Sequence, residues 1–182
     1  MNPTYVFKSE RLGFRNWVNA DIEKMIVISG NQEVMEHFPS TAPPENTKAF
    51  IIRMQEMYER TGFCYFAVDR LDSSEFIGFI GLAEQDFDVP FCPCIDIGWR
   101  LSPQHLNFGF ASEGAKACLD FGHNQLGINQ IMSIAPEANL KSVGVMKKIG
   151  MTEVLKFDHP LLINYARLVN CVCYVSENKQ TK

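Results

Sequence analysis

The order of strand-like and helix-like segments is the feature that most constrains the fold of this 182-residue chain. Apolar residues recur at three- to four-residue spacing in four segments, which predicts helices over residues 20–29, 44–60, 109–123 and 140–149. Shorter apolar runs bounded by turn residues predict strands over residues 5–7, 12–15, 64–68, 75–82, 95–101, 130–135, 152–157 and 168–175. The second half thus alternates strand, helix, strand, helix, strand. This order predicts an α/β (α+β) fold with a mixed central β-sheet and helices on its faces.

Individual residues support the boundaries of these elements. Asn19 is expected to cap the first helix through its side chain, and Pro44 suits the first position of the second. Gly62 follows the last turn of that helix, as a helix-terminating glycine often does. Residues 71–74 have the composition of a hairpin turn between two strands.

Composition limits the class of protein. The chain is 46% hydrophobic, with 14 Phe, 5 Tyr and 2 Trp, so it can bury the core of one domain, expected over residues 1–182 with its core at about 8–175. The formal charge of 17 − 21 = −4 argues against a general nucleic-acid binder. No apolar stretch is long enough to span a membrane, and Lys8, Glu10 and Arg11 interrupt the region where an export signal would be apolar. We therefore expect a cytoplasmic protein.

The six cysteines do not have the spacing of a metal site. Cys92 and Cys94 are separated by one residue, as are Cys171 and Cys173, whereas paired zinc ligands are separated by two to four. Residues two apart share one face of a strand, so Cys171 and Cys173 are expected to be small core side chains. We expect reduced thiols and no metal.

The segment from Ile95 to Gly114 has the pattern of a strand, a short loop and a helix. The strand is expected to end at Leu101, and Asn107 and Gly109 suit a loop with left-handed backbone. A helix that begins directly after such a loop presents unpaired N–H groups and a positive dipole end, which can hold a phosphate; the alternative is a plain strand-to-helix connection. The loop has neither the Lys-Ser/Thr pair of a Walker motif nor the glycine spacing of a dinucleotide site, so any phosphates would belong to another cofactor.

Several motifs match, in order, the patterns of one known family. An N-terminal Thr/Ser-Glu-Arg-Leu-x-Leu-Arg pattern is matched by Ser9–Arg15, followed by Asp21, and a Glu-Ile-Gly-Tyr-x-Leu strand is matched by Asp96–Leu101. A Gln/Arg-x-x-Gly-x-Gly/Ala motif is matched by Gln104–Gly109, with Asn107 where the first glycine is usual. Two later matches continue the pattern: Phe110–Glu113, and a block that combines Asn139–Ser142 with Met146–Met151. Through these motifs the chain resembles GNAT-superfamily N-acetyltransferases of the RimJ/RimL branch, in which the third motif binds acetyl-CoA, and the resemblance extends over nearly the whole chain.

The resemblance implies acetyl-CoA as cosubstrate and a GNAT fold whose sheet splays open after the strand ending at Leu101. The pantetheine arm would lie in that gap, and the pyrophosphate would rest on N–H groups from Asn107 to Ala111. Asn139 could contact pantetheine, but it is also a good N-cap for the helix that follows. The implied cofactor-binding residues are Trp99, Arg100, Leu101, Gln104, Asn107, Phe108, Gly109, Phe110, Ala111, Ser112, Asn139 and Ser142.

Catalysis requires a neutral amine, so a carboxylate or histidine must remove a proton from the ammonium form. Asp96 and Glu84 are the candidate bases, although each could be a solvent-facing carboxylate, and His105 is expected on the loop surface. In many relatives a tyrosine protonates the leaving thiolate, but Met146 occupies that position here. The candidate acids are therefore Ser142, a water molecule, or a tyrosine from elsewhere.

Tyr165 and Tyr174 are the tyrosines that could protonate the leaving thiolate.

The predicted function is direct acetyl transfer from acetyl-CoA to a primary amine, either a protein N-terminus or a polyamine or aminoglycoside-like small molecule. The alternative is a catalytically silent CoA-binding regulatory module, which Met146 and Asn107 favour. The resemblance is compatible with a monomer or a homodimer, and the sequence does not identify the acceptor.

Overall fold

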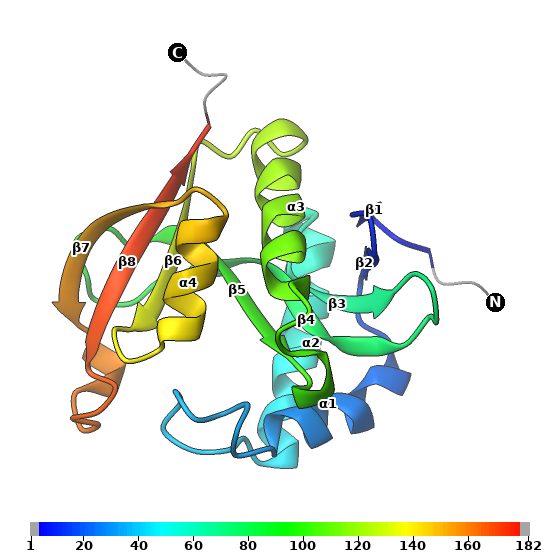
Figure 1. The fold of residues 1–182 in the computed structure, drawn as a ribbon, viewed down its shortest axis with the longest axis horizontal. Coiled ribbons are helices and arrows are strands. Elements are labelled where there is room, and N and C mark those ends of the chain that lie inside the picture. Colours follow the sequence, from blue (N-terminus) through cyan, green and yellow to red (C-terminus); the bar gives the residue numbers. More distant parts are fainter. Residues whose placement is uncertain (1–3, 179–182) are drawn as a thin grey trace.

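The computed structural model describes residues 4–178, which form one eight-stranded mixed sheet with helices on both faces (Figure 1). The strand order is β1-β2-β3-β4-β5-β6-β8-β7. The strands are β1 (Phe7–Lys8), β2 (Leu12–Arg15), β3 (Tyr65–Arg70), β4 (Phe76–Gln85), β5 (Cys94–Leu101), β6 (Gln130–Pro136), β7 (Thr152–Asp158) and β8 (Asn170–Glu177). The helices are α1 (Ile22–Ser29), α2 (Pro44–Thr61), α3 (Phe110–Asn124) and α4 (Leu140–Lys148). The predicted fold class is confirmed.

The helix boundaries confirm most of the predicted signals and correct one. Pro44 occupies the first turn of α2, and Gly62 ends that helix with a left-handed φ of 79°. The prediction for Asn19 is wrong, because Asn19 lies in a short 3-10 turn (Asn19–Asp21) and α1 begins only at Ile22. The carboxylate of Asp21 instead accepts the N–H of Val18 at 2.9 Å, which satisfies a backbone donor where the turn begins.

Two layers of helices cover opposite faces of the sheet. Helix α3 packs against β4 so closely that a Cβ added to Gly114 would lie 2.4 Å from Ile80 Cδ1. On the other face Phe50 of α2 packs against Phe79 of β4 and Tyr65 of β3, with ring centroids 5.2 and 6.3 Å away. Figure 1 shows α3 in front of the strands and α2 behind them. Residues of β5 therefore project alternately toward α3 and toward the α1–α2 layer.

The middle of the sheet splays open. Strands β4 and β5 are paired from Gly78↔Leu101 to Gln85↔Cys94, whereas β5 and β6 pair in parallel only at Asp96↔Met132. Beyond that point the two strands diverge (Figure 1), and one side chain, that of Ser133, bridges them by donating to the Ile97 carbonyl at 3.2 Å. The edge of β5 that follows Asp96 is left without a strand partner, which confirms the splay implied by the resemblance.

Arg15 joins three parts of the N-terminal half in a buried ion-pair network. Its guanidinium donates two hydrogen bonds to Asp21 at 2.7 and 2.8 Å, and two to Asp69 at 2.7 and 2.9 Å. All three side chains are nearly inaccessible to solvent. Arg15 and Asp21, which belong to the N-terminal motif, thus connect β2 to the turn before α1 and to β3.

The cysteines of β8 have the predicted burial. Cys171 and Cys173 are buried side chains of β8, as predicted, and all six cysteines are free thiols. Within residues 4–178, no helix combines the length and apolar character needed to cross a bilayer.

We expect Arg15→Met to lower the free energy of unfolding by about 3–5 kcal/mol, because it leaves two buried carboxylates without a counter-charge. Urea denaturation followed by circular dichroism measures this loss. Lys24→Met is the control, since Lys24 is an exposed cation of α1 and its removal should change stability by less than about 0.5 kcal/mol. Equal stability of the two variants would contradict the role given to Arg15.

Candidate active site

The loop between β5 and α3 has two residues with left-handed backbone. Asn107 has a φ of 64° and Gly109 a φ of 81°. Asparagine tolerates this region better than other non-glycine residues, so Asn107 can follow a backbone path that usually needs glycine. Gly109 then forms the N-cap of α3 without any side-chain capping bond.

The start of α3 presents a continuous run of unpaired donors. The backbone N–H groups of residues 107–112 find no acceptor in the described part of the chain, and the first bond of the helix runs from Glu113 N to Gly109 O at 3.0 Å. Six successive N–H groups at the positive end of a 15-residue helix favour a bound anion. They include the N–H groups from Asn107 to Ala111 on which the resemblance places the pyrophosphate.

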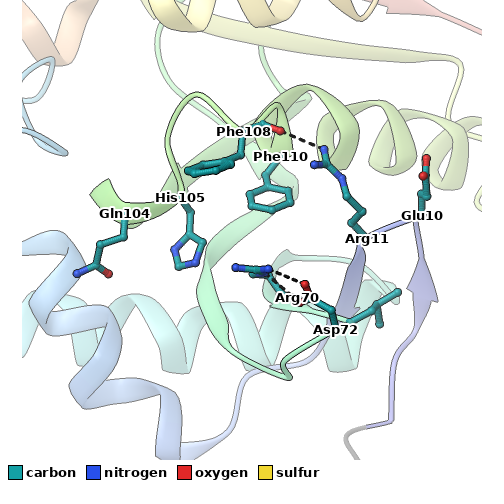
Figure 2. A pocket seen from close by; sticks show the side chains of 9 residues that line it. Glu10, Arg11, Arg70, Asp72, Gln104, His105, Phe108 and Phe110 are labelled. Atoms are coloured by element: carbon teal, nitrogen blue, oxygen red, sulfur yellow. Dashed lines mark hydrogen bonds and ion pairs between the residues drawn. The ribbon is translucent and has the colours of Figure 1, made fainter.

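The N-terminal motif holds this loop in place. The Ser9 hydroxyl and the Arg11 backbone N–H both donate to Glu113 Oε1, at 2.7 and 2.8 Å, and Arg11 Nε donates to Glu113 Oε2 at 2.6 Å. Arg11 Nη2 also donates to the Phe108 carbonyl at 3.1 Å (Figure 2). Burial raises the pKa of Glu113, but the hydrogen bonds from Ser9 and Arg11 outweigh it, so the pKa is lowered and the carboxylate stays ionised. Two motifs about a hundred residues apart thus form one clamp.

A cavity of about 480 Å³ lies beside this clamp (Figure 2). Gln104, Phe108 and Phe110 of the predicted set line it, together with residues of the β3–β4 hairpin that the sequence did not indicate. The guanidinium of Arg70, from that hairpin, lies 5.8 Å from the centre of the Phe110 ring and pairs with Asp72. The full lining is Glu10, Arg11, Arg70, Leu71, Asp72, Gln104, His105, Phe108 and Phe110.

The prediction that His105 lies on the loop surface is wrong. Its exposed fraction is 6%, its Nδ1 lies 2.7 Å from Ser102 Oγ, and its Nε2 lies 3.3 Å from Glu75 Oε2. A short 3-10 turn (Pro103–His105) directs the imidazole inward, where these two polar groups satisfy it. These contacts hold the imidazole in the wall of the cavity, under the loop.

Asp96 is buried at the point where β5 leaves β6. The Tyr65 hydroxyl donates to Asp96 Oδ1 at 2.5 Å, and Gln85 Nε2 donates to the same oxygen at 3.2 Å. Burial raises the pKa of Asp96 to about 6, although the hydrogen bonds from Tyr65 and Gln85 act in the opposite direction. A carboxyl group with this pKa can accept a proton near neutral pH. Tyr65 and Gln85 were not predicted from the sequence, because only the strand register brings them to Asp96.

Glu84 has a different environment. It forms an ion pair with Arg60 of α2 at 2.5 Å, its side chain is 44% exposed, and the hydrogen bond from Arg60 lowers its pKa. It pairs with Ile95 in the sheet, so it projects from the face opposite to that of Asp96. Glu84 lines a second cavity, of about 640 Å³, that also includes Gln85. The structure does not bring the two candidate bases together.

Helix α4 places two predicted residues beside the gap. Asn139 caps this helix, as its sequence position suggested, because its Oδ1 accepts the Ser142 N–H at 3.1 Å. The Asn139 amide nitrogen and the Ser142 hydroxyl have no partner among the described residues. Met146 is 1% exposed and belongs to the core.

The two tyrosines named as alternative acids lie after β7, Tyr165 in the connection to β8 and Tyr174 on β8. Tyr174 is buried and its hydroxyl donates to Glu153 Oε2 at 2.9 Å. Tyr165 is 43% exposed and lies in the connection between β7 and β8. Ser142 lies instead at the start of α4, and its hydroxyl has no partner among residues 4–178.

The side chains of β5 divide between the two faces. Trp99 pairs with Ile80 and so faces α3, whereas Arg100 pairs with Phe79 and faces the α1–α2 layer. Leu101 is buried where the strand ends. The remaining predicted residues, Ala111 and Ser112, are partly buried in the first turn of α3. Across residues 4–178, no group of three or more His, Cys, Asp or Glu side chains is placed to hold a metal ion.

Comparisons with known proteins agree with this geometry. The acetyltransferase (GNAT) domain family matches residues 11–152. A Bacillus subtilis protein described as an uncharacterized N-acetyltransferase, YnaD, is 28% identical over 145 residues, which are 79% of this chain and 80% of that protein. The crystal structure of a GNAT-family acetyltransferase from Bacillus anthracis superposes with a TM-score of 0.79 at 24% identity and covers 94% of this chain and 97% of that one.

A spermidine N-acetyltransferase from Vibrio cholerae, solved with CoA and spermine, superposes with a TM-score of 0.72 at 16% identity, over 92% of this chain and 95% of that chain. A mixed sheet splayed beside a helix with free N–H groups is thus the fold of an acetyltransferase. The chain belongs to the GNAT acetyltransferase family, and the prediction of an N-acetyltransferase is confirmed. The RimJ/RimL branch and the identity of the acceptor stay predictions.

The raised pKa of Asp96 makes the stability of the folded protein depend on pH. Because its folded pKa of about 6 lies above the ordinary value of 3.8, the folded state holds the proton more tightly, and stability falls as pH rises from about 4 to about 6. An asparagine side chain at this position would not ionise, so we expect Asp96→Asn to gain about 1–3 kcal/mol relative to wild type between pH 4 and pH 7.

Chemical denaturation at the two pH values measures this change. Asp88→Asn is the control, because Asp88 is exposed and its substitution should change stability by less than about 0.5 kcal/mol at either pH. A difference between Asp96→Asn and wild type that does not change with pH would contradict the buried, ionising Asp96.

Proposed function

We propose that this chain transfers the acetyl group of acetyl-CoA directly to a primary amine, without a covalent enzyme intermediate. The observation that carries the proposal is the run of unpaired N–H groups at residues 107–112, placed at the open side of the splayed sheet. The pyrophosphate of CoA is the anion that fits these donors. The clamp of Ser9, Arg11 and Glu113 fixes the loop before the cofactor arrives.

The pantetheine arm would extend from this loop along the unpaired edge of β5, over Trp99, Arg100 and Leu101. Its amides can pair with backbone groups that β6 does not reach, as an added strand would. Asn139 caps α4 through its carbonyl oxygen, which leaves its amide nitrogen free to donate to pantetheine. Capping and cofactor binding therefore use different atoms of the same side chain.

Asp96 is the better candidate for the general base. Its pKa of about 6 leaves it ionised at pH 7, where it can take a proton from the ammonium group of the acceptor, directly or through water. Glu84 is less suited, because Arg60 holds it as an exposed, paired carboxylate with a lowered pKa. The amine then attacks the thioester carbon, while N–H groups of β5 near Trp99 polarise the carbonyl oxygen. Ser142, whose hydroxyl is unpaired, would return a proton to the CoA thiolate.

The proposed acceptor is a protein N-terminus, as in the RimJ/RimL branch, or a polyamine or aminoglycoside-like amine. The Vibrio cholerae spermidine N-acetyltransferase supports only the shared fold, because its identity to this chain is 16%. A catalytically silent CoA-binding module remains the second candidate, since Met146 is buried where relatives use a tyrosine. Release of free thiol in a panel of amines separates the two, because CoA binding without turnover on any amine favours the silent module.

Gly109→Val tests the cofactor site. A β-branched residue at a φ of 81° costs about 1–3 kcal/mol in local strain, so the loop should rearrange and the Kd for acetyl-CoA should rise about tenfold or more. Isothermal titration calorimetry measures the affinity. Gly62→Val is the matched control, because Gly62 has a φ of 79° at the end of α2, and its strain should lower stability without changing the Kd. Equal CoA affinity for both variants would overturn the assignment of the loop.

Asp96→Asn tests the base. We expect it to lower kcat by about 100- to 10,000-fold, because general base catalysis supplies that range, and to leave the Kd for acetyl-CoA unchanged. Glu84→Gln should leave kcat nearly unchanged, since it removes only an exposed ion pair. Steady-state rates of thiol release compare the variants. If Glu84→Gln abolished turnover and Asp96→Asn did not, the roles of the two carboxylates would be reversed.

A further inference from the structure

Arg100 is a largely buried arginine without a carboxylate partner in the described part of the chain. Its Nη1 donates to Ser29 Oγ at 3.2 Å, and its Nε is inaccessible to solvent and has no hydrogen-bond partner. The guanidinium lies near two aromatic rings, 4.5 Å from the centre of Phe38 and 5.4 Å from that of Phe79. Arg15 shows the ordinary arrangement, because two carboxylates surround it.

This environment is costly for a cation that remains charged. Burial lowers the pKa of Arg100 to about 10, which still leaves the guanidinium protonated at neutral pH. A buried charge is normally paired, and the planar fork of arginine matches a carboxylate in two parallel hydrogen bonds. Nη1 has one hydroxyl partner and Nη2 has none within residues 4–178. Nη2, unlike Nε, is not enclosed, so this end of the guanidinium is the part that an anion can complete.

The site lies on the side of the sheet that carries the proposed base. Arg100 and Asp96 are four residues apart on β5, so both project toward the α1–α2 layer. The Arg100 charge acts electrostatically on the Tyr65 phenol, and Tyr65 in turn donates to Asp96. The N–H groups of residues 107–112 belong to the start of α3, the helix on the other face, so the CoA phosphates proposed to bind them would not neutralise Arg100.

The segment between α1 and α2 covers this part of the sheet. It contributes Phe38, and it is joined to the β7–β8 connection by a hydrogen bond of 2.6 Å from Arg167 Nη2 to the Glu36 carbonyl. His37 Nδ1, in the same segment, and Thr47 Oγ1, at the start of α2, are also buried without partners. The segment that contributes Phe38 and the start of α2 thus each hold one buried polar atom without a partner within residues 4–178.

We propose that Arg100 binds an anionic group of the acceptor, so that the acceptor is an amine of the amino-acid type that also carries a carboxylate. This inference rests on the proposed function and names its substrate class. In the reaction the amine nitrogen forms the new C–N bond, the C–S bond of acetyl-CoA breaks, Asp96 takes the amine proton, and the thiolate is protonated as CoA leaves. A polyamine would instead bring further positive charge to an unpaired cation.

Matched pairs of amines test the proposal. Ornithine and putrescine differ only by a carboxylate, as do lysine and cadaverine. Wild type should use the carboxylate-bearing member of at least one pair with a kcat/KM about tenfold or more above that of its partner. Arg100→Gln should raise KM for that member by about 10- to 100-fold and abolish the preference, because it removes a charge-assisted hydrogen bond. Equal use of both members by wild type, or an unchanged preference in Arg100→Gln, would overturn the inference.

Arg100→Lys keeps the charge but loses the planar fork of guanidinium N–H donors, so we expect it to keep only part of the preference for the carboxylate-bearing amine. This variant serves as the test if Arg100→Gln does not fold. Calorimetry of each amine against the CoA-loaded protein gives a readout that needs no turnover. Wild type should bind the carboxylate-bearing member more tightly than its partner, and the variants should bind it more weakly. Equal or absent binding of the two members would overturn the inference even if transfer activity were found.

The two proposals fail in distinguishable ways. Transfer to diamines with no preference for a carboxylate would leave the acetyltransferase function standing and remove the role of Arg100. Selective binding of the carboxylate-bearing amine without any transfer would support Arg100 as an anion site and remove the proposed function. A loss of CoA affinity in Arg100→Gln would show that the side chain serves the cofactor, which contradicts the inference.

Discussion

The separation of β5 from β6 after Asp96 is the constraint on which the rest of the structure depends. A strand inside a sheet normally satisfies its backbone groups on both edges, but β5 pairs with β6 at one position only. The unsatisfied edge is stable because β4 holds β5 along its whole length, and because α3 packs closely against β4. The splay thus gives the protein an open row of backbone donors and acceptors in its centre, next to a buried carboxyl group.

The two faces of β5 divide the chemistry. On the side of α3, the N–H groups of residues 107–112 have no acceptor among the described residues and can bind an anion. Arg11 of the N-terminal motif holds this loop through its ion pair with Glu113. On the side of α1 and α2, Asp96, Tyr65 and Arg100 are polar groups that lie close to the aromatic ring of Phe79 or to one another. Cofactor and acceptor would therefore approach from opposite faces and meet where the sheet opens. Because side chains alternate along a strand, one eight-residue segment can serve both sites.

The sequence predicted those parts of the fold and of the site that are determined by residues a few positions apart. The helix and strand order, the left-handed loop at Asn107 and Gly109, and the cap at Asn139 all follow from periodicity, backbone preference or capping chemistry within a few residues. The prediction that Asn19 caps the first helix was wrong. Asp21, which is held by Arg15, accepts the backbone N–H of Val18 instead. The family resemblance supplied the ligand but not the contacts that hold the loop.

Contacts between distant residues could not be predicted. Glu113 accepts from Ser9 and Arg11, and neither segment carries a signal that names its partner. The surroundings of Asp96 and Arg100 depend on strand register and on the segment that covers the sheet, so the sequence could not distinguish a buried carboxyl from an exposed one. His105 shows the same limit, because a polar loop residue became buried once Ser102 and Glu75 satisfied it.

The central claim is that the open edge of β5 and the free N–H groups before α3 form one site for acetyl-CoA. Hydrogen–deuterium exchange of backbone amides, with and without acetyl-CoA, tests this claim most directly. We predict slower exchange on binding in two segments, residues 98–101 and 107–112, while the paired amides of β8 stay as they were. Unchanged exchange in both segments under saturating acetyl-CoA would contradict the account.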